Sequence, residues 1–173
     1  MRNKTIYNVL VLHRTMELID VNVCDVPKYI PEFVHLGYSK IPNAGLGVFA
    51  TTRIKQGTFM GNYMGEILDS ADEMTTNEYL YGTYSRTKKF TIDGSSIEKS
   101  NYTRFINCCS ANYNENLVGI RYTPSEGSSV YRTRTGKQID IDGYIFFYAT
   151  RDIEQGEELY YDYGEAYRKK LGI

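Results

Sequence analysis

The sequence lacks the features that mark secreted, disulfide-rich and membrane-spanning proteins. Its three cysteines, Cys24, Cys108 and Cys109, form neither an even disulfide framework nor a four-ligand zinc set. No run of about 18 apolar residues occurs, and no basic segment followed by an apolar one opens the chain. We therefore expect a soluble, intracellular protein without a structural metal site.

An excess of charge of either sign is also missing. The chain carries 20 Lys and Arg against 21 Asp and Glu, which gives a formal net charge of −1. This balance provides no general attraction to nucleic acid or to an anionic membrane, so we expect direct binding to neither. The 173 residues contain no internal repeat and no low-complexity linker, and they suffice for one domain with its own core.

Short β-rich segments separated by Gly, Asn and Asp make up most of the chain. One helix is predicted at 71–80, where Ser70 and Glu73 form a capping box, and a helical turn is expected within 97–107. The turn-rich region 123–143 is expected to hold a loop or a small hairpin. The predicted strands are 5–12, 17–23, 46–51, 58–68, 89–93, 116–122, 144–150 and 158–163. The fold class is therefore mainly β with few short helices.

The paired glycines of 43-NAGLGVFAT-51 have two interpretations. They resemble a nucleotide-binding loop, but a third glycine and a following helix are missing, so neither a dinucleotide motif nor a P-loop is present. Gly45 and Gly47 either form a plain turn or let the backbone pass close to a ligand, because they carry no Cβ atom.

The vicinal pair Cys108 and Cys109 raises the alternative of a thiol hydrolase. Such an enzyme needs a base that keeps the cysteine ionised, and the chain offers His13 and His35. Nothing in the sequence places either histidine near the cysteines. Two small, packed side chains are therefore the favoured interpretation.

Acidic residues gather near the end of the sequence. Their spacing fits a solvated rim and fits equally a surface that attracts a basic peptide, so both interpretations stay open. The residues concerned are Glu154, Glu157, Glu158, Asp162 and Glu165.

Tyrosine is unusually abundant, with 17 in the chain and no tryptophan. The segment 158-ELYYDYGEAY-167 holds four tyrosines in ten residues, which is too many for a solvated terminus and too polar for an ordinary core strand. From spacing alone, Tyr161 and Tyr163 would merely alternate across a strand. The other motifs of the chain favour a functional role instead.

Five separated segments carry those motifs: 45-GLGVFATTRIKQG-57, 61-GNYMGE-66, 104-RFIN-107, 116-NL-117 and 151-RDIEQGEELYYDYG-164. In this order they resemble the SET-domain protein lysine methyltransferases, over residues 38–167. The resemblance implies a fold of small curved sheets in which the C-terminal segment threads beneath the loop 104–118 as a pseudoknot. We accordingly expect a SET domain at 38–173 and an N-terminal extension at 1–37, formed as a β-hairpin packed on the domain.

The resemblance also implies methyl transfer from S-adenosylmethionine to a lysine ε-amine, with a histone tail as the default substrate and a nuclear, chromatin-associated or cytoplasmic location. Tyr163 matches the catalytic tyrosine, Tyr161 the position where tyrosine implies monomethylation, and Tyr63 a tyrosine of the lysine channel. An aromatic channel lowers the pKa of the amine from about 10.4 by desolvation, and phenols orient it without adding charge. An extended peptide is expected to add to a sheet edge near 79–92.

One position departs from the family pattern at the expected cofactor site. Cys108 stands where most SET domains have a histidine, and 107-NCCSANYN-114 lacks the usual proline. This departure supports an alternative, a catalytically weak PR-like domain that binds other proteins. Residues 92–118 resemble the PR-type SET domains, whereas the C-terminal motif resembles that of monomethylating enzymes. No cysteine cluster follows Gly164, so we expect Tyr167 and the Lys-rich end to close the site. The residues matched to the cofactor site are Gly45, Leu46, Gly47, Arg104, Asn107 and Cys108.

Overall fold

The structure, a computed structural model, describes residues 30–69, 79–84, 89–122, 129–132, 138–141 and 144–171. Two predictions lie outside the described residues, namely the hairpin of 5–12 with 17–23 and the capping box of Ser70 and Glu73. Within these ranges no helix has the length and apolar character that crossing a membrane requires.

Short strands dominate the described part of the chain, and one α-helix, α1 (Glu165–Leu171), ends it. A 3₁₀ turn, η2 (Tyr102–Phe105), lies within the segment where a helical turn was predicted. The strands are β1 (Val34–Tyr38), β2 (Leu46–Ala50), β3 (Phe59–Asn62), β4 (Glu66–Asp69), β5 (Leu80–Tyr84), β6 (Lys89–Asp93), β7 (Asn107–Cys108), β8 (Leu117–Tyr122), β9 (Ser129–Arg132), β10 (Gln138–Ile141), β11 (Tyr144–Ala149) and β12 (Tyr160–Tyr161). The prediction of a mainly β fold is confirmed.

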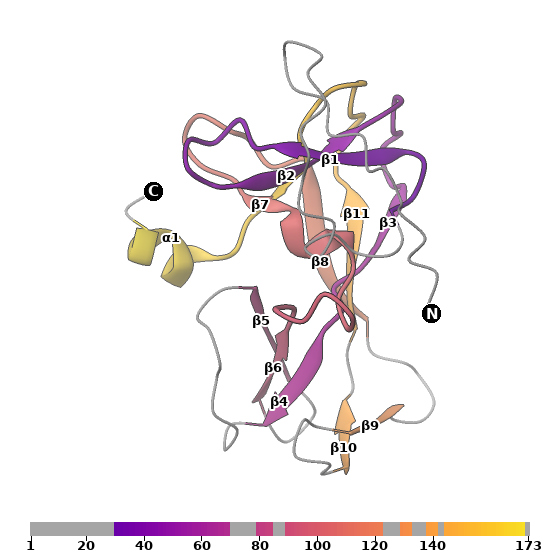
Figure 1. The fold of residues 1–173 in the computed structure, drawn as a ribbon, viewed down its shortest axis with the longest axis vertical. Coiled ribbons are helices and arrows are strands. Elements are labelled where there is room, and N and C mark those ends of the chain that lie inside the picture. The colour runs from indigo at the N-terminus through magenta and orange to yellow at the C-terminus, as the bar shows by residue number, and fades with distance from the viewer. Residues whose placement is uncertain are drawn as a thin grey trace, which may run out of the picture.

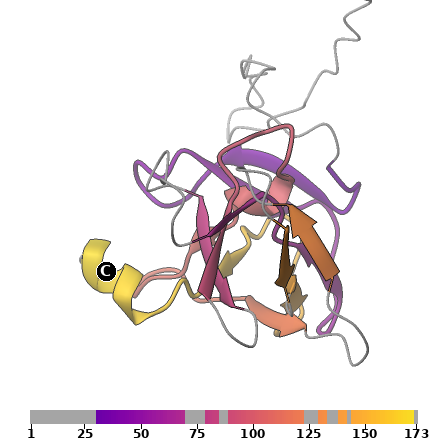
Figure 2. The ribbon, with the colours of Figure 1, turned by 90° about the horizontal axis from the view of Figure 1, so that it is seen from below.

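The strands form several small sheets rather than one large one. The pair β1-β2 lies across the top of the molecule in Figure 1, the sheet β3-β11-β8 runs down the centre, and the sheet β4-β6-β5 lies below it. Seen from below, the sheets surround a common centre, with α1 to one side (Figure 2). Strands β9 and β10 form a hairpin, which agrees with the prediction for 123–143.

Strand β11 shows how the sequence produces this arrangement. Successive side chains of a strand point to opposite faces, and here Ile145, Phe147 and Ala149 are buried while Phe146 and Tyr148 are partly exposed. The buried set joins residues of the other sheets, among them Leu36 of β1, in one hydrophobic cluster. A single core therefore holds the small sheets together.

Four local predictions differ from the structure. The strand predicted at 58–68 divides into β3 and β4, because at Gly65 the backbone passes so near Asp93 that a Cβ atom would lie 2.3 Å from its carbonyl oxygen. The helix predicted through residue 80 is wrong at its end, since Leu80 begins β5. Strand 158–163 shrinks to β12. Helix α1 was not predicted.

The end of the chain threads through a loop, as a pseudoknot requires. Strand β12 pairs in parallel with β7, so that Tyr160 lies opposite Asn107. On its other side, the amide nitrogen of Asn116 donates to the carbonyl oxygen of Tyr160 at 3.1 Å, and the Asn116 side chain donates to the carbonyl oxygen of Glu158 at 2.8 Å. The loop between residues 107 and 116 therefore brackets the C-terminal segment from both sides.

A buried carboxylate fixes this crossing. Glu158 is 2% exposed and accepts four hydrogen bonds from three separate parts of the chain. Ser39 Oγ donates at 2.6 Å and the Lys40 amide at 2.7 Å, both from the turn after β1. The Tyr160 hydroxyl donates at 2.6 Å and Asn107 Nδ2 at 3.2 Å. The carboxyl group leaves none of these four donors unpaired, and a buried donor without a partner would lower the stability of the fold.

We predict that Glu158→Gln weakens the fold. The amide keeps the shape but turns one acceptor oxygen into a donor, which leaves two of the four donors facing an NH₂ group. The free energy of unfolding, measured by urea titration, should fall by about 2–4 kcal/mol. Glu154→Gln, at an exposed ion pair with Arg53, is the matched control and should change it by less than about 0.5 kcal/mol. Equal effects of the two substitutions would contradict this role of Glu158.

Candidate functional site

Aromatic side chains from separate parts of the chain meet around Tyr161. Its ring centroid lies 4.7 Å from that of Phe147 and 4.6 Å from that of Tyr163. It also stacks on Tyr81 at 5.9 Å, and Tyr81 in turn lies 5.2 Å from Tyr63. The three tyrosines that the motifs indicated therefore belong to one group. With Tyr167 of α1, whose ring lies 4.8 Å from that of Tyr163, we call it the tyrosine cluster: Tyr63, Tyr81, Phe147, Tyr161, Tyr163 and Tyr167.

Two hydroxyl groups of the cluster are fixed by backbone carbonyls. The Tyr163 hydroxyl donates to the carbonyl oxygen of Ile106 at 2.6 Å, and the Tyr63 hydroxyl donates to that of Tyr79 at 2.6 Å. Since each phenol proton is engaged in this way, each oxygen keeps lone pairs that can accept a further hydrogen bond. The arrangement therefore presents acceptors at fixed positions.

Burial keeps these phenols neutral. Desolvation raises the pKa of Tyr63, Tyr161 and Tyr163 above the ordinary value near 10, and the neighbouring phenols raise the pKa of Tyr161 and Tyr163 further. Tyr161 is itself 5% exposed. The site is thus a largely apolar environment with oriented hydroxyl oxygens, which disfavours a charged ammonium and accepts a neutral amine. Its nearest buried charged residues are Arg104 and Asp93, which act on Tyr63.

The glycine pair lies next to Asn107. The carbonyl oxygen of Leu46 accepts a hydrogen bond from Asn107 Nδ2 at 3.0 Å, and a Cβ atom on Gly47 would lie 2.2 Å from the Glu158 carboxylate. Gly45 has a φ of +71°, a left-handed conformation that favours glycine. At Gly47 the missing Cβ atom makes room for the Glu158 side chain, so the interpretation of a close backbone approach holds there, although the neighbour is not a ligand.

Arg104 has a different environment from the other residues matched to the cofactor site. Its guanidinium group lies 3.9 Å from the ring centroid of Tyr79 and 5.0 Å from that of Phe105, and one nitrogen donates to the carbonyl oxygen of Ser95 at 3.2 Å. The side chain is buried, and its Nε has no hydrogen-bond partner in the described structure. Because the Nε atom is itself buried, a ligand can reach it only if neighbouring side chains move.

The thiol-hydrolase alternative is not supported by the two cysteines. Cys108 and Cys109 are buried, and burial raises the pKa of both thiols, which disfavours the reactive thiolate. His35 stacks on Phe49 instead, with 5.5 Å between the ring centroids, and burial lowers its pKa. His13 lies outside the described residues.

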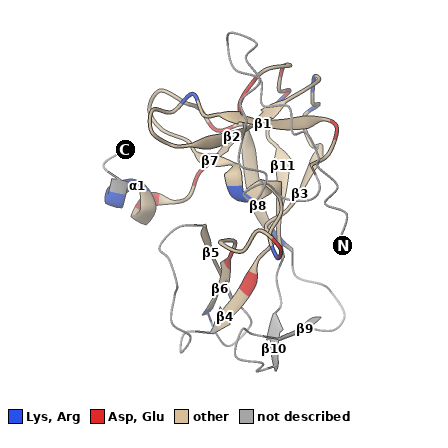
Figure 3. Ribbon diagram, viewed as in Figure 1, with Lys and Arg blue, Asp and Glu red and all other residues tan. Residues whose placement is uncertain are grey.

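The C-terminal acids are mostly paired with cations of the same chain, which favours a solvated rim over a peptide-attracting surface. Figure 3 shows acidic and basic residues interspersed along the ribbon. Glu158 is the exception, because it is buried within the fold. The ion pairs are Glu154 with Arg53, Glu157 with Arg151, Asp162 with Arg168 and Glu165 with Lys169.

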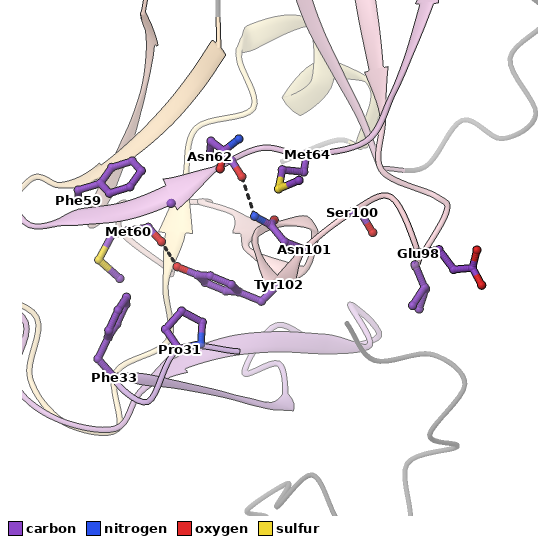
Figure 4. A pocket seen from close by; sticks show the side chains of 12 residues that line it. Pro31, Phe33, Phe59, Met60, Asn62, Met64, Glu98, Ser100, Asn101 and Tyr102 are labelled. Atoms are coloured by element: carbon purple, nitrogen blue, oxygen red, sulfur yellow. Dashed lines mark hydrogen bonds between the residues drawn. The ribbon is translucent and has the colours of Figure 1, made fainter. Parts of the chain in front are cut away.

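A cavity of about 510 Å³ lies beside β3 and shares no lining residue with the tyrosine cluster (Figure 4). Pro31, Phe33, Phe59 and Met60 contribute apolar walls. Asn101 closes one side by donating to the carbonyl oxygen of Asn62 at 2.9 Å. The cavity is therefore separate from the site that the motifs indicated.

Sequence reasoning missed two members of the cluster. Tyr81 lies on β5, a strand that was not predicted. Phe147 lies on β11, and the alternation of that strand was a usable signal for its inward direction. Tyr167 was expected to help close the site, and its contact with Tyr163 agrees with that expectation.

Comparisons with known proteins identify the family of this chain. The family model described as "SET domain" matches residues 45–164. The histone-lysine N-methyltransferase set-17 of Caenorhabditis elegans is 30% identical over 138 residues, which are 80% of this chain and 43% of that protein. The chain thus spans less than half the length of the first curated relatives that it matches.

Solved structures agree on the fold. The methyltransferase domain of human PR domain-containing protein 2 superposes with a TM-score of 0.58 at 23% identity, covering 95% of this chain and 97% of that one. SUVH6 of Arabidopsis thaliana, solved in complex with SAM, superposes with a TM-score of 0.56 at 26% identity and covers 76% of this chain and 27% of its own. The expected fold of small sheets with a C-terminal pseudoknot is confirmed.

The buried phenols predict an alkaline transition. The unfolded chain releases phenol protons near pH 10, whereas the folded chain retains those of the tyrosine cluster, so stability must fall as the pH rises above about 10. Phenolate absorbance should therefore rise in two stages, and the second should coincide with loss of the circular dichroism signal. Complete ionisation near pH 10 with an unchanged dichroism signal would contradict the burial of the cluster.

Proposed function

The chain belongs to the SET-domain family, and on this basis we propose that it is a protein-lysine N-methyltransferase that uses S-adenosylmethionine. The observation that carries the proposal is the tyrosine cluster, in which Tyr63, Tyr161 and Tyr163 combine burial with neutral phenols. Lysine must lose its proton before it can attack a methyl group, and desolvation favours that loss. The relative set-17, whose name states histone-lysine methylation, supports a protein substrate.

The residues around the glycine pair fit the methyl donor. We assign the main chain of Gly45, Leu46 and Gly47 to it, together with Asn107 and Cys108; the SUVH6 structure, which contains SAM, supports the choice of cofactor. When bound, the donor supplies an electrophilic methyl group on a positively charged sulfur.

Arg104 is assigned to the same donor by its match to the family motif. Its guanidinium group is the cation proposed for the carboxylate of the donor's amino-acid moiety. The position usually held by histidine is filled by Cys108, a smaller side chain that is 6% exposed. The thiol offers only a weak donor, so Arg104 and Asn107 carry most of the polar recognition.

Residues of this chain account for the deprotonation and the orientation of the lysine amine. Burial among aromatic rings lowers the pKa of an incoming ammonium from about 10.4, so that no strong base is needed. The hydroxyl oxygens of Tyr163 and Tyr63, whose protons point to carbonyl groups, accept the N–H bonds and direct the nitrogen lone pair away from themselves. Alignment of the reacting atoms lowers the barrier further, by up to about 7–11 kcal/mol in favourable cases.

Tyr161 supports a preference for one methyl group. It is packed between Phe147, Tyr81 and Tyr163, so its hydroxyl occupies space that a second methyl group on the same nitrogen would need. The proposed product is therefore monomethyl-lysine.

An extended peptide, proposed to be a histone tail, has an edge to bind. Strand β5 is the outer strand of the sheet β4-β6-β5, and it carries Tyr81 of the cluster. A peptide that adds to such an edge gains main-chain hydrogen bonds and places alternate side chains toward the sheet face. A histone substrate implies a nuclear, chromatin-associated location.

Tyr163→Phe tests the enzyme. Loss of the hydroxyl removes an acceptor for the amine, and we expect incorporation of labelled methyl groups into a histone panel to fall by about 100-fold or more. Tyr148→Phe removes a phenol outside the cluster and should leave incorporation unchanged. If wild type shows no more label than Tyr163→Phe, the PR-like interaction domain becomes the better interpretation, because Cys108 replaces the usual histidine.

Tyr161→Phe tests the methyl count. Removal of this hydroxyl frees space beside the acceptor nitrogen, so dimethyl-lysine and trimethyl-lysine should appear where wild type yields monomethyl-lysine. Mass spectrometry of the modified histones measures the distribution. A wild-type enzyme that produces mainly trimethyl-lysine would overturn the role given to Tyr161.

A further inference from the structure

Two buried thiols and one carboxylate meet beside the crossing of the chain. The sulfur atoms of Cys108 and Cys109 and a carboxylate oxygen of Asp162 all lie within 4.8 Å of one another. The cysteines are 6% and 8% exposed, whereas Asp162 lies at the surface. The group is therefore closed on the thiol side and open to solvent on the carboxylate side.

The backbone holds these three residues in place. Cys108 lies opposite Tyr161 in the parallel pair of β7 and β12, and the Cys109 amide donates to the carbonyl oxygen of Tyr161 at 3.0 Å. Asp162 follows Tyr161 directly, so both halves of the group are attached to the same pair of strands. Little rearrangement is then needed to bring the three ligand atoms onto one ion.

We propose that Cys108, Cys109 and Asp162 form a binding site for Zn²⁺, with water as the fourth ligand. Zinc binds thiolates at about 2.3 Å and carboxylates at about 2.0–2.2 Å in a tetrahedron, which places two ligated sulfurs about 3.8 Å apart. The three candidate ligand atoms, all within 4.8 Å of one another, lie near enough to meet this requirement after small side-chain movements. Binding releases the thiol protons to solvent. The site differs from the four-cysteine structural site that the sequence excludes.

Arg168 is the cation that pairs with Asp162 when no metal ion is bound. Its guanidinium donates to Asp162 Oδ2 at 2.9 Å, while the Gly164 amide donates to Oδ1 at 2.7 Å. A bound ion and Arg168 draw on the same carboxylate, and their like charges repel. Zinc binding and this ion pair therefore compete.

The site has a consequence for methyl transfer, which rests on the proposed function. Cys108 is among the residues assigned to the methyl donor, and Tyr167 of α1 contacts Tyr163. An ion bound to the Cys108 thiol withdraws it from the donor and loosens α1 next to the catalytic tyrosine. Zinc should consequently inhibit methyl transfer, with less inhibition at a higher concentration of donor.

Metal titration of the full chain tests the site without any methyl donor. Cys24→Ser removes the third thiol, and a phosphine reductant keeps the other two reduced. Cd²⁺, which gives an ultraviolet thiolate charge-transfer band, should bind at one equivalent and be displaced by Zn²⁺. In that background Cys109→Ser and Asp162→Asn should each weaken binding by about 10-fold or more, whereas Arg168→Ala should strengthen it.

Glu165→Gln is the matched control, because Glu165 is an exposed acid three residues from Asp162 and pairs with Lys169. It should leave the metal affinity unchanged, and Asp162→Asn, at the surface, should retain the wild-type circular dichroism. Absence of the charge-transfer band, or an affinity that ignores both Asp162→Asn and Arg168→Ala, would overturn the site. Neither result depends on methyl transfer, so failure of the proposed function is recognised separately.

Discussion

The Glu158 carboxylate is the contact on which the rest of the structure depends. It joins the turn after β1, the start of β7 and the C-terminal strand, which are far apart in the sequence. All three carry residues assigned to methyl transfer or adjoin them. The same hydrogen bonds therefore stabilise the fold and position the site, and the stability of one cannot be separated from the geometry of the other.

Close to this carboxylate, the tyrosine cluster relies on neutral side chains rather than on an ionised base. The surface ion pairs lie at the rim, whereas the tyrosine cluster consists of neutral rings whose hydroxyl protons are directed to backbone carbonyls. A site built in this way needs no ionised base, because burial itself changes the protonation of the incoming amine. Phenols suit this environment, since they provide oriented oxygens at a low cost of desolvation.

The sequence predicted the features that depend on local pattern or on ordered motifs. Strands such as β6 and β11 follow from alternation and flanking turns, and the meeting of Tyr63 with Tyr163 followed from the resemblance to a known family. Other features depend on contacts between distant segments. The role of Glu158, first grouped with surface acids, and the position of Tyr81 in the cluster arise only when β5, β7 and β12 assemble. Propensity within a short window carries no information on such contacts.

The threaded crossing also determines when a working site comes into existence. Tyr163 and Ile106, which share a hydrogen bond, are 57 positions apart, and β12 follows the glycine pair and β7 in the sequence. A nascent chain that already displays the glycine pair and β7 still lacks the complete tyrosine cluster. Contacts of such long sequence separation form slowly, because the loop must close before they bring any gain. Catalytic competence should therefore arrive only once β12 has been synthesised and threaded through the loop, and not gradually as the earlier strands form.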